Sequence, residues 1–129
     1  MIMKTVIVEN TFLKRQYDIP DEKPIIMDFG WGNGYALIPI DHPLFGRHYD
    51  DINEHIDIHG GLTFSAFVNE GLIQSFGIDP EYDGYWCVGF DTCHYQDTLA
   101  RWPKEAVQIE ADELARQLEL FEVAWNNNL

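Results

Sequence analysis

The apolar residues of the C-terminal segment recur every three or four positions. They are Val107, Ala111, Leu114, Leu118, Phe121 and Trp125. This spacing places them along one side of an α-helix and leaves most of the segment's carboxylates on the opposite side, toward water. Pro103 suits the first helical position because its fixed φ is helical and its missing N–H needs no partner there. The pattern predicts one long amphipathic helix from Pro103 onward, whose apolar side must pack against another layer.

The preceding sequence shows the shorter patterns typical of β-strands. Segments that are apolar, or that alternate between apolar and polar, lie at 2–8, 25–29, 35–40, 62–68 and 84–91. Asn33 and Gly34 both tolerate the positive φ of a tight turn, which predicts a hairpin between 25–29 and 35–40. In segment 84–91 the face that carries Tyr85, Cys87, Gly89 and Asp91 is the one we expect to carry chemistry. Strands first and one long helix last indicate an α+β fold, with a mostly antiparallel sheet packed against one long C-terminal helix.

The chain of 129 residues fits a single domain, 1–129, because one core commonly serves chains of this length. Its 46% apolar and 14% aromatic residues predict a packed interior. The only cysteines, Cys87 and Cys93, are too few for a disulfide framework or a zinc knuckle, so we expect two buried, unreactive thiols in a reducing, cytoplasmic setting. Neither a signal peptide nor a membrane-spanning segment is expected.

The charge balance is strongly acidic. Twenty-two acidic against eight basic side chains give a formal net charge of −14, which repels nucleic-acid phosphates and anionic membrane surfaces. Direct binding to nucleic acid or membrane is therefore not expected. The surplus is consistent with a solvated surface, with cation binding, or with imitation of a nucleic acid so as to occupy the basic groove of a host protein.

Two segments contain the residues best suited to chemistry. His59 precedes the Gly60-Gly61 pair, and His94 lies between Asp91 and Asp97. Imidazole and carboxylate form the ligand set of zinc, manganese and iron sites, so His59, Asp91 and His94 are predicted as ligands of a divalent metal, with Asp97 as a further candidate. With Asp97 they are also the candidate catalytic residues. A metal with an open position would activate water, which points to hydrolysis.

Other interpretations of the same residues stay open. A metal-free acid-base or ligand pocket uses the same four side chains. A purely structural interpretation has His59 bonded to a backbone carbonyl before the glycine turn and Asp91 capping the turn that contains His94. Alternation over 56–59 predicts a strand, from which Asp57 would orient an imidazole. Loop 41–51 is interpreted as a surface loop or as a lid over the histidines.

Four short motifs occur together. They are WGxGY at 31–35, DHPL at 41–44, HGGLT at 59–63 and GFDxxHxxD at 89–97. In this combination the chain resembles a family of small uncharacterised bacterial and phage proteins, over about residues 30–120. The resemblance implies that the histidine and aspartate positions act together, and it implies no substrate and no cofactor. Cys93 and Gln96 depart from the small residues expected between Asp91 and Asp97, which puts a tight turn there in question.

Three functions compete. The first is a small-molecule or divalent-metal site at the junction of 56–63 and 86–97, with hydrolysis as its chemistry. The second is an acidic, phage-type interaction protein that occupies a basic groove of a host protein. The third is an assembly module that forms a homodimer through exposed tryptophans, with Trp31, Trp102 and Trp125 as candidates.

Overall fold

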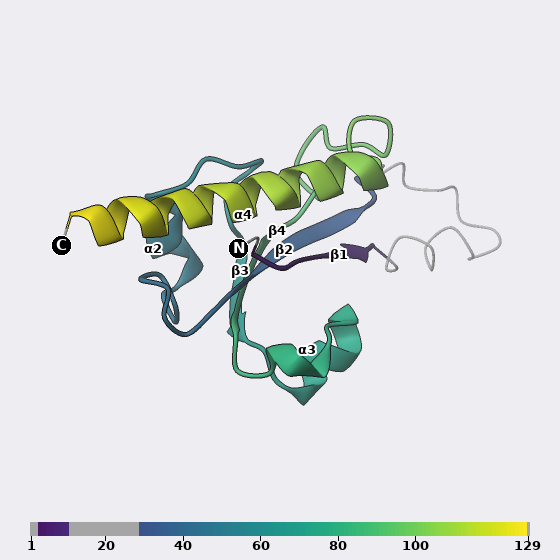
Figure 1. The fold of residues 1–129 in the computed structure, drawn as a ribbon. Coiled ribbons are helices and arrows are strands. Elements are labelled where there is room, and N and C mark those ends of the chain that lie inside the picture. The colour runs from purple at the N-terminus through teal and green to yellow at the C-terminus, as the bar shows by residue number, and fades with distance from the viewer. Residues whose placement is uncertain (1–2, 11–28, 129) are drawn as a thin grey trace, which may run out of the picture.

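The computed structural model describes residues 3–10 and 29–128. Its centre is an antiparallel sheet of four strands in the order β1-β2-β4-β3. The strands are β1 (Thr5–Glu9), β2 (Gly32–Ile38), β3 (Phe64–Phe67) and β4 (Trp86–Phe90). Helix α4 (Lys104–Asn127) and the short α2 (Tyr49–Asn53) lie on one face, and α3 (Glu70–Phe76) lies on the other (Figure 1). A single 3₁₀ turn, η1 (Pro80–Tyr82), precedes β4. The α+β prediction is confirmed.

The long C-terminal helix forms as its spacing predicts. Val107, Ala111, Leu114 and Leu118 are completely buried against the sheet. Burial of each larger side chain contributes about 1.5–3 kcal/mol, which fixes α4 across β1 and β2. The stripe ends before the helix does, because Trp125 is 49% exposed. Of the three tryptophans considered for self-association, Trp31 and Trp102 instead pack against the core.

Both faces of β4 are buried. Trp86, Val88 and Phe90 belong to the core cluster under α4, whereas Cys87 belongs to a second cluster on the α3 side. On the face expected to carry chemistry, Cys87 and Gly89 are therefore unavailable, because both are buried. A central strand covered by helices on both sides has no exposed face, so functional groups can only lie at its ends.

The hairpin predicted at Asn33 and Gly34 does not form. Both residues lie inside β2, where Asn33 is opposite Val8 and Gly34 is opposite Ile7 of β1. A Cβ on Gly34 would lie 2.5 Å from the ring of Phe90, so the missing side chain makes room for packing. Gly34 thus allows close packing within the sheet, and Asn33 and Gly34 do not form a turn. The partner proposed for this hairpin, 25–28, lies outside the described residues.

The segment before the Gly60-Gly61 pair is also not a strand. Ile58 is buried and Ile56 is partly buried, and both pack against the core cluster under α4. The alternation of these isoleucines with polar residues therefore comes from a loop whose isoleucines face the core, and not from a strand. Along residues 3–10 and 29–128 no helix combines the length and apolarity needed to cross a bilayer.

Candidate functional site

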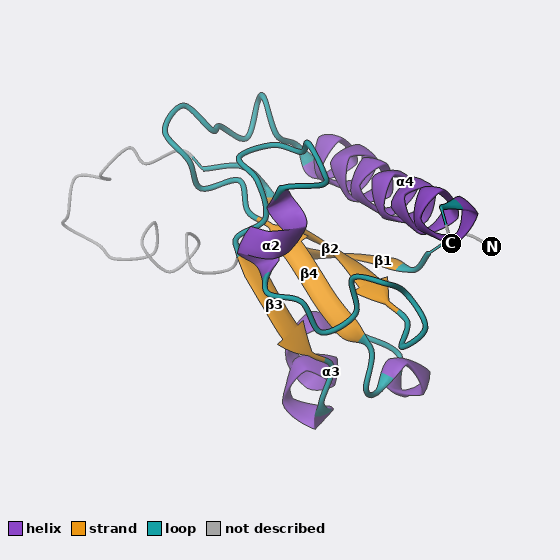
Figure 2. Cartoon of the chain, turned by 90° about the vertical axis from the view of Figure 1, so that its left-hand side faces the viewer, coloured by secondary structure: helices purple, strands orange, loops and turns teal. Residues whose placement is uncertain are grey.

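Two loops leave the sheet at the same end. Phe64 is paired with Gly89, so the segment that enters β3 and the segment that leaves β4 begin side by side. The N–H of Thr63 donates to the carbonyl of Gly89 at 2.9 Å, which extends this pairing by one step. Figure 2 shows the loops extending beyond this end of the sheet. The antiparallel register thus brings His59 close to His94, although they are 35 positions apart in the sequence.

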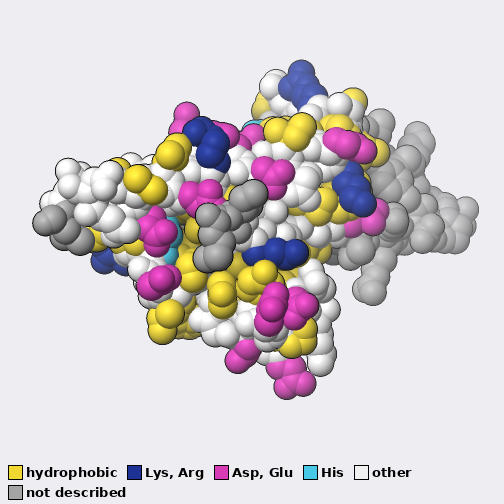
Figure 3. All heavy atoms as spheres, in the orientation of Figure 1, with side chains coloured by type: hydrophobic (Ala, Val, Ile, Leu, Met, Phe, Trp, Pro, Cys, Tyr) yellow, Lys and Arg dark blue, Asp and Glu magenta, His cyan; other side chains and the backbone are white. Residues whose placement is uncertain are grey.

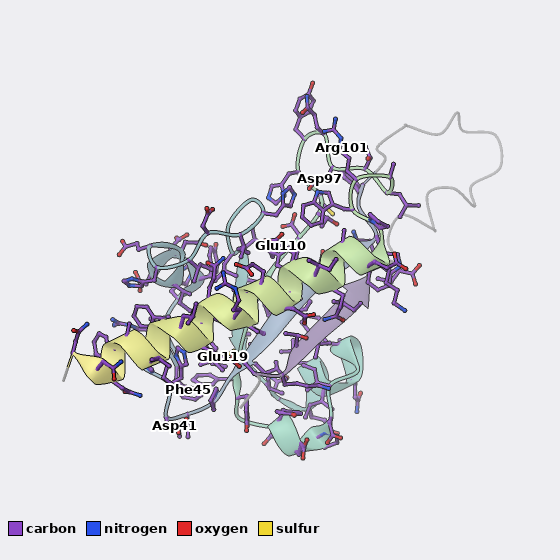
Figure 4. All side chains as sticks on the ribbon, turned by 45° about the horizontal axis from the view of Figure 1, so that its top comes forward. Asp41, Phe45, Asp97, Arg101, Glu110 and Glu119 are labelled. Carbon is purple, nitrogen blue, oxygen red and sulfur yellow. The ribbon has the colours of Figure 1, made fainter. Side chains whose placement is uncertain are left out.

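Asp97 is the centre of the cluster. Its carboxylate is 5% exposed and accepts a hydrogen bond from His59 Nε2, with N–O distances of 2.8 and 3.0 Å to the two oxygens. It also accepts the backbone N–H of His94 at 2.9 Å, and His94 Nδ1 lies 3.3 Å from the same oxygen. Asp97 therefore joins the two histidine-bearing loops beside the N-terminal half of α4 (Figure 4).

These contacts decide the charge of Asp97. Burial raises the pKa of the carboxyl, but hydrogen bonds from His59 and from the backbone N–H of His94 outweigh it, so the net pKa lies below 3.8. The carboxylate is ionised at neutral pH. A buried anion needs a compensating positive charge, which a metal cation held between the two imidazoles would supply.

Asp91 lies at the edge of the cluster. One oxygen accepts the hydroxyl of Thr63 at 2.9 Å. The other accepts the N–H of Cys93 at 3.0 Å and lies 3.4 Å from His94 Nδ1. Asp91 caps the turn that contains His94, as one of the sequence interpretations predicts.

His59, His94 and Asp97 meet the spatial requirement for ligands of a common ion. One ligand atom from each of the three lies within 4.8 Å of the other two. The sequence had predicted His59, Asp91 and His94 as the metal ligands, with Asp97 as a further candidate ligand and as a catalytic residue. The geometry brings all four residues together and makes Asp97, rather than Asp91, the carboxylate between the histidines.

Several supporting residues were not predicted. The ring of Trp102, two residues before the start of α4, lies 4.1 Å from the ring of His59. Gly60 lies against His94, since a Cβ there would be 2.4 Å from Cε1 of the imidazole. Asn53 of α2 binds both the N–H and the carbonyl of Leu62, at 2.6 and 3.0 Å. Of these features, only the Gly60-Gly61 pair is visible in the sequence, where such a pair marks a bulge, a bend or a close backbone approach.

Other predicted contacts do not form. The carboxylate of Asp57 is exposed, and the backbone of this residue binds Gln117 of α4. No hydrogen bond or ion pair joins Asp57 to His59 within the described residues. Cys93 is exposed, so the prediction of a buried thiol there is wrong, whereas Cys87 is buried as predicted.

Loop 41–48 lies away from the histidine cluster. His42 is buried and its Nε2 lies 2.8 Å from the carbonyl of Leu118, which fixes the loop to the C-terminal half of α4. Figure 4 accordingly shows Asp41 and Phe45 far from Asp97. This is a surface loop anchored to the core by His42 and Leu44, with Asp41 and residues 46–48 exposed, and it does not cover the cluster as a lid.

No known protein family, no curated protein and no solved structure matches the chain. The chemistry of the site therefore has to be argued from its geometry.

Proposed function

We propose that this protein binds a divalent transition metal between His59, His94 and Asp97, and that the bound metal activates water for hydrolysis. The observation that carries the proposal is the convergence of two imidazoles and one buried carboxylate within 4.8 Å of one another. Three protein ligands with a remaining position for water is the arrangement of catalytic rather than structural zinc sites.

The distances agree with this assignment. Donor atoms around a tetrahedral zinc ion, with bonds of about 2.0–2.1 Å, lie roughly 3.3–3.4 Å apart. Nε2 of His59 and Nδ1 of His94 lie 2.8 and 3.3 Å from oxygens of Asp97. Shifts of a few tenths of an ångström, with loss of the protons between these atoms, would convert the hydrogen-bonded cluster into a ligand set. Nitrogen ligands favour zinc, manganese or iron over calcium or magnesium.

The surroundings favour a fixed site. Trp102 covers one side of the His59 ring, and Gly60 leaves space for the His94 ring. Asp91 is a second carboxylate, 30% exposed, next to His94. We assign it as the general base that accepts the proton of the attacking water, because it is close to the cluster but more open to solvent than Asp97.

Elemental analysis of tag-free protein tests the proposal. We expect near-stoichiometric zinc, manganese or iron, acquired in the cell or on titration, and loss of the metal from His59→Ala and His94→Ala. His55→Ala is the matched control, because His55 is exposed and contacts Phe121 instead of the cluster. Circular dichroism checks that each variant is folded.

Retention of metal by both site variants, or absence of metal after titration, would refute the metal site. If metal binds, a panel of ester, amide and phosphoester substrates tests the hydrolytic part. Asp91→Asn should then lower turnover while the metal stays bound.

The acidic interaction protein remains the alternative function. On the face drawn in Figure 3, carboxylates are scattered among hydrophobic and basic side chains and do not form one continuous patch. A surface that imitates a nucleic acid needs regularly spaced carboxylates, and this face does not provide them.

A further inference from the structure

A separate cavity lies along the C-terminal half of α4. It has a volume of about 490 Å³ and opens between α4, the start of β1 and η1. This size falls within the roughly 300–1,000 Å³ of small-molecule sites. Glu119, which lines it, and Asp97 lie on different sides of α4 in Figure 4, so the cavity is distinct from the histidine cluster.

The cavity has an apolar floor and an aromatic wall. Leu37 of β2 is 1% exposed and forms part of the floor. Tyr82 and Tyr85 line the wall, with their rings edge to face and 5.0 Å between centroids. Figure 3 shows hydrophobic side chains gathered between α4 and α3, with charged groups among them. Such a lining accommodates the apolar body of a ligand, and tyrosine faces also attract cations.

The charged side chains of the lining favour a ligand of positive charge. Glu119 and Glu122 are both half-buried, and Lys4 is exposed. Glu119 accepts the backbone N–H of Met3. In the described part of the chain, Glu122 makes neither a hydrogen bond nor an ion pair, and no ion pair joins Lys4 to either glutamate. Among the described residues of the lining, two carboxylates and one ammonium leave one negative charge, within a chain whose net charge is −14.

We propose that this cavity binds a small organic cation with an apolar body, such as an aromatic or alkyl amine. The ammonium group binds Glu122, and the apolar part lies on Leu37 and the two tyrosines. A half-buried carboxylate without a partner gains a charge-assisted hydrogen bond from an amine, whereas an anion of the same shape would be repelled. The site does not depend on the metal proposed above.

Titration of ¹⁵N-labelled protein with tryptamine tests the proposal. We expect saturable shifts of the amides of Lys4, Leu37 and Tyr85, and no comparable shifts with the anion indole-3-propionate or the neutral tryptophol. Glu122→Gln should weaken binding at least about tenfold, because it removes the charge of the ion pair. Glu105→Gln changes the net charge equally at an exposed site in the first turn of α4, and should change the affinity less than about twofold.

A second variant tests the position of the site. Val123 lines the cavity and is 55% exposed, so Val123→Arg should fold normally and place a guanidinium where the ammonium binds. This variant should abolish the tryptamine shifts. The proposal is overturned if no saturable shifts occur, if the neutral or anionic analogue binds as well, or if Glu105→Gln weakens binding as much as Glu122→Gln. Equal weakening by the two glutamine variants would mean that tryptamine is attracted to the acidic surface in general and not to this cavity.

Discussion

Replacing Gly60 by alanine should displace His94 from the candidate metal site, whereas replacing Gly61 should not. Both glycines have a positive φ, +67° and +75°, so alanine costs about 1–2 kcal/mol of backbone strain at either position. The two sites differ in what the new Cβ meets. At Gly60 it would lie 2.4 Å from Cε1 and 2.7 Å from Nε2 of His94, whereas at Gly61 its nearest neighbour is Oδ1 of Asn53 at 3.3 Å.

Normal carbon contacts lie at about 3.5–4.0 Å, so the His94 ring must move by roughly 1 Å in Gly60→Ala. A displaced ligand typically weakens metal binding by at least about tenfold. We expect both variants to lose about 1–2 kcal/mol of unfolding free energy from strain, and Gly60→Ala to lose more from the clash. Gly61→Ala should keep its zinc affinity within about threefold of the original protein, because its ligands remain in place.

Urea unfolding of metal-free protein measures the stability of both variants, and competition with a chromophoric chelator measures zinc affinity. Imidazole NMR signals of His94 report the ring position without metal. If both variants bind zinc equally, or if the His94 signals are the same in both, the contact between Gly60 and His94 does not position the ligand. An equal loss of affinity in both would assign the effect to strain in the turn.

Three further predictions concern the rest of the molecule. In metal-free protein, Asp97→Asn should lower the unfolding free energy by about 1–3 kcal/mol at neutral pH. Because folding lowers the pKa of Asp97, its carboxylate stabilises the fold fully above the ordinary pKa of 3.8, and this stabilisation is lost as the pH falls through the folded-state pKa. The unfolding free energies of the two proteins in urea should therefore converge in acid. A difference that stays constant with pH would contradict this reasoning. Iodoacetamide at pH 8 should modify the exposed Cys93 alone in folded protein, since burial raises the pKa of Cys87 to about 12. Mass spectrometry should show a second adduct only in denaturant. Modification of Cys87 in the folded protein would refute its burial. Leu118→Ala, at a fully buried site, should lower the unfolding free energy in urea by about 2–5 kcal/mol. Ile109→Ala, at a 69% exposed position of the same helix, should change it by less than about 0.5 kcal/mol. Equal losses of unfolding free energy would argue against the orientation of α4.

The sequence determined the elements whose patterns are long or regular. The repeat from Val107 to Leu118 was sufficient to predict the helix and its buried side, because only a helix brings residues three and four positions apart onto one face. The α+β class was predicted as well, although the helices α2 and α3, which lie between strands, were not. Histidine and aspartate at 59, 91, 94 and 97 stood out because imidazole with carboxylate is a restricted chemical combination.

Short glycine patterns were ambiguous in the sequence. Glycine serves a turn through its positive φ and serves close packing through its missing Cβ, and sequence does not separate these uses. Asn33-Gly34 suggested a turn, but Gly34 faces the ring of Phe90 inside β2. Gly60 uses both properties, since its φ is positive and the ring of His94 occupies the space beside it.

Only the tertiary structure decided which carboxylate lies between the histidines. His59 and His94 approach each other because the register of β3 on β4 places their loops at one end of the sheet. The turn after Asp91 then directs Asp97 inward, where it is 5% exposed, and leaves Asp91 at the edge, 30% exposed. The sequence thus determined which groups were suited to the chemistry. Their distances depended on strand pairing and on a turn closed by hydrogen bonds, and both are properties of the folded chain.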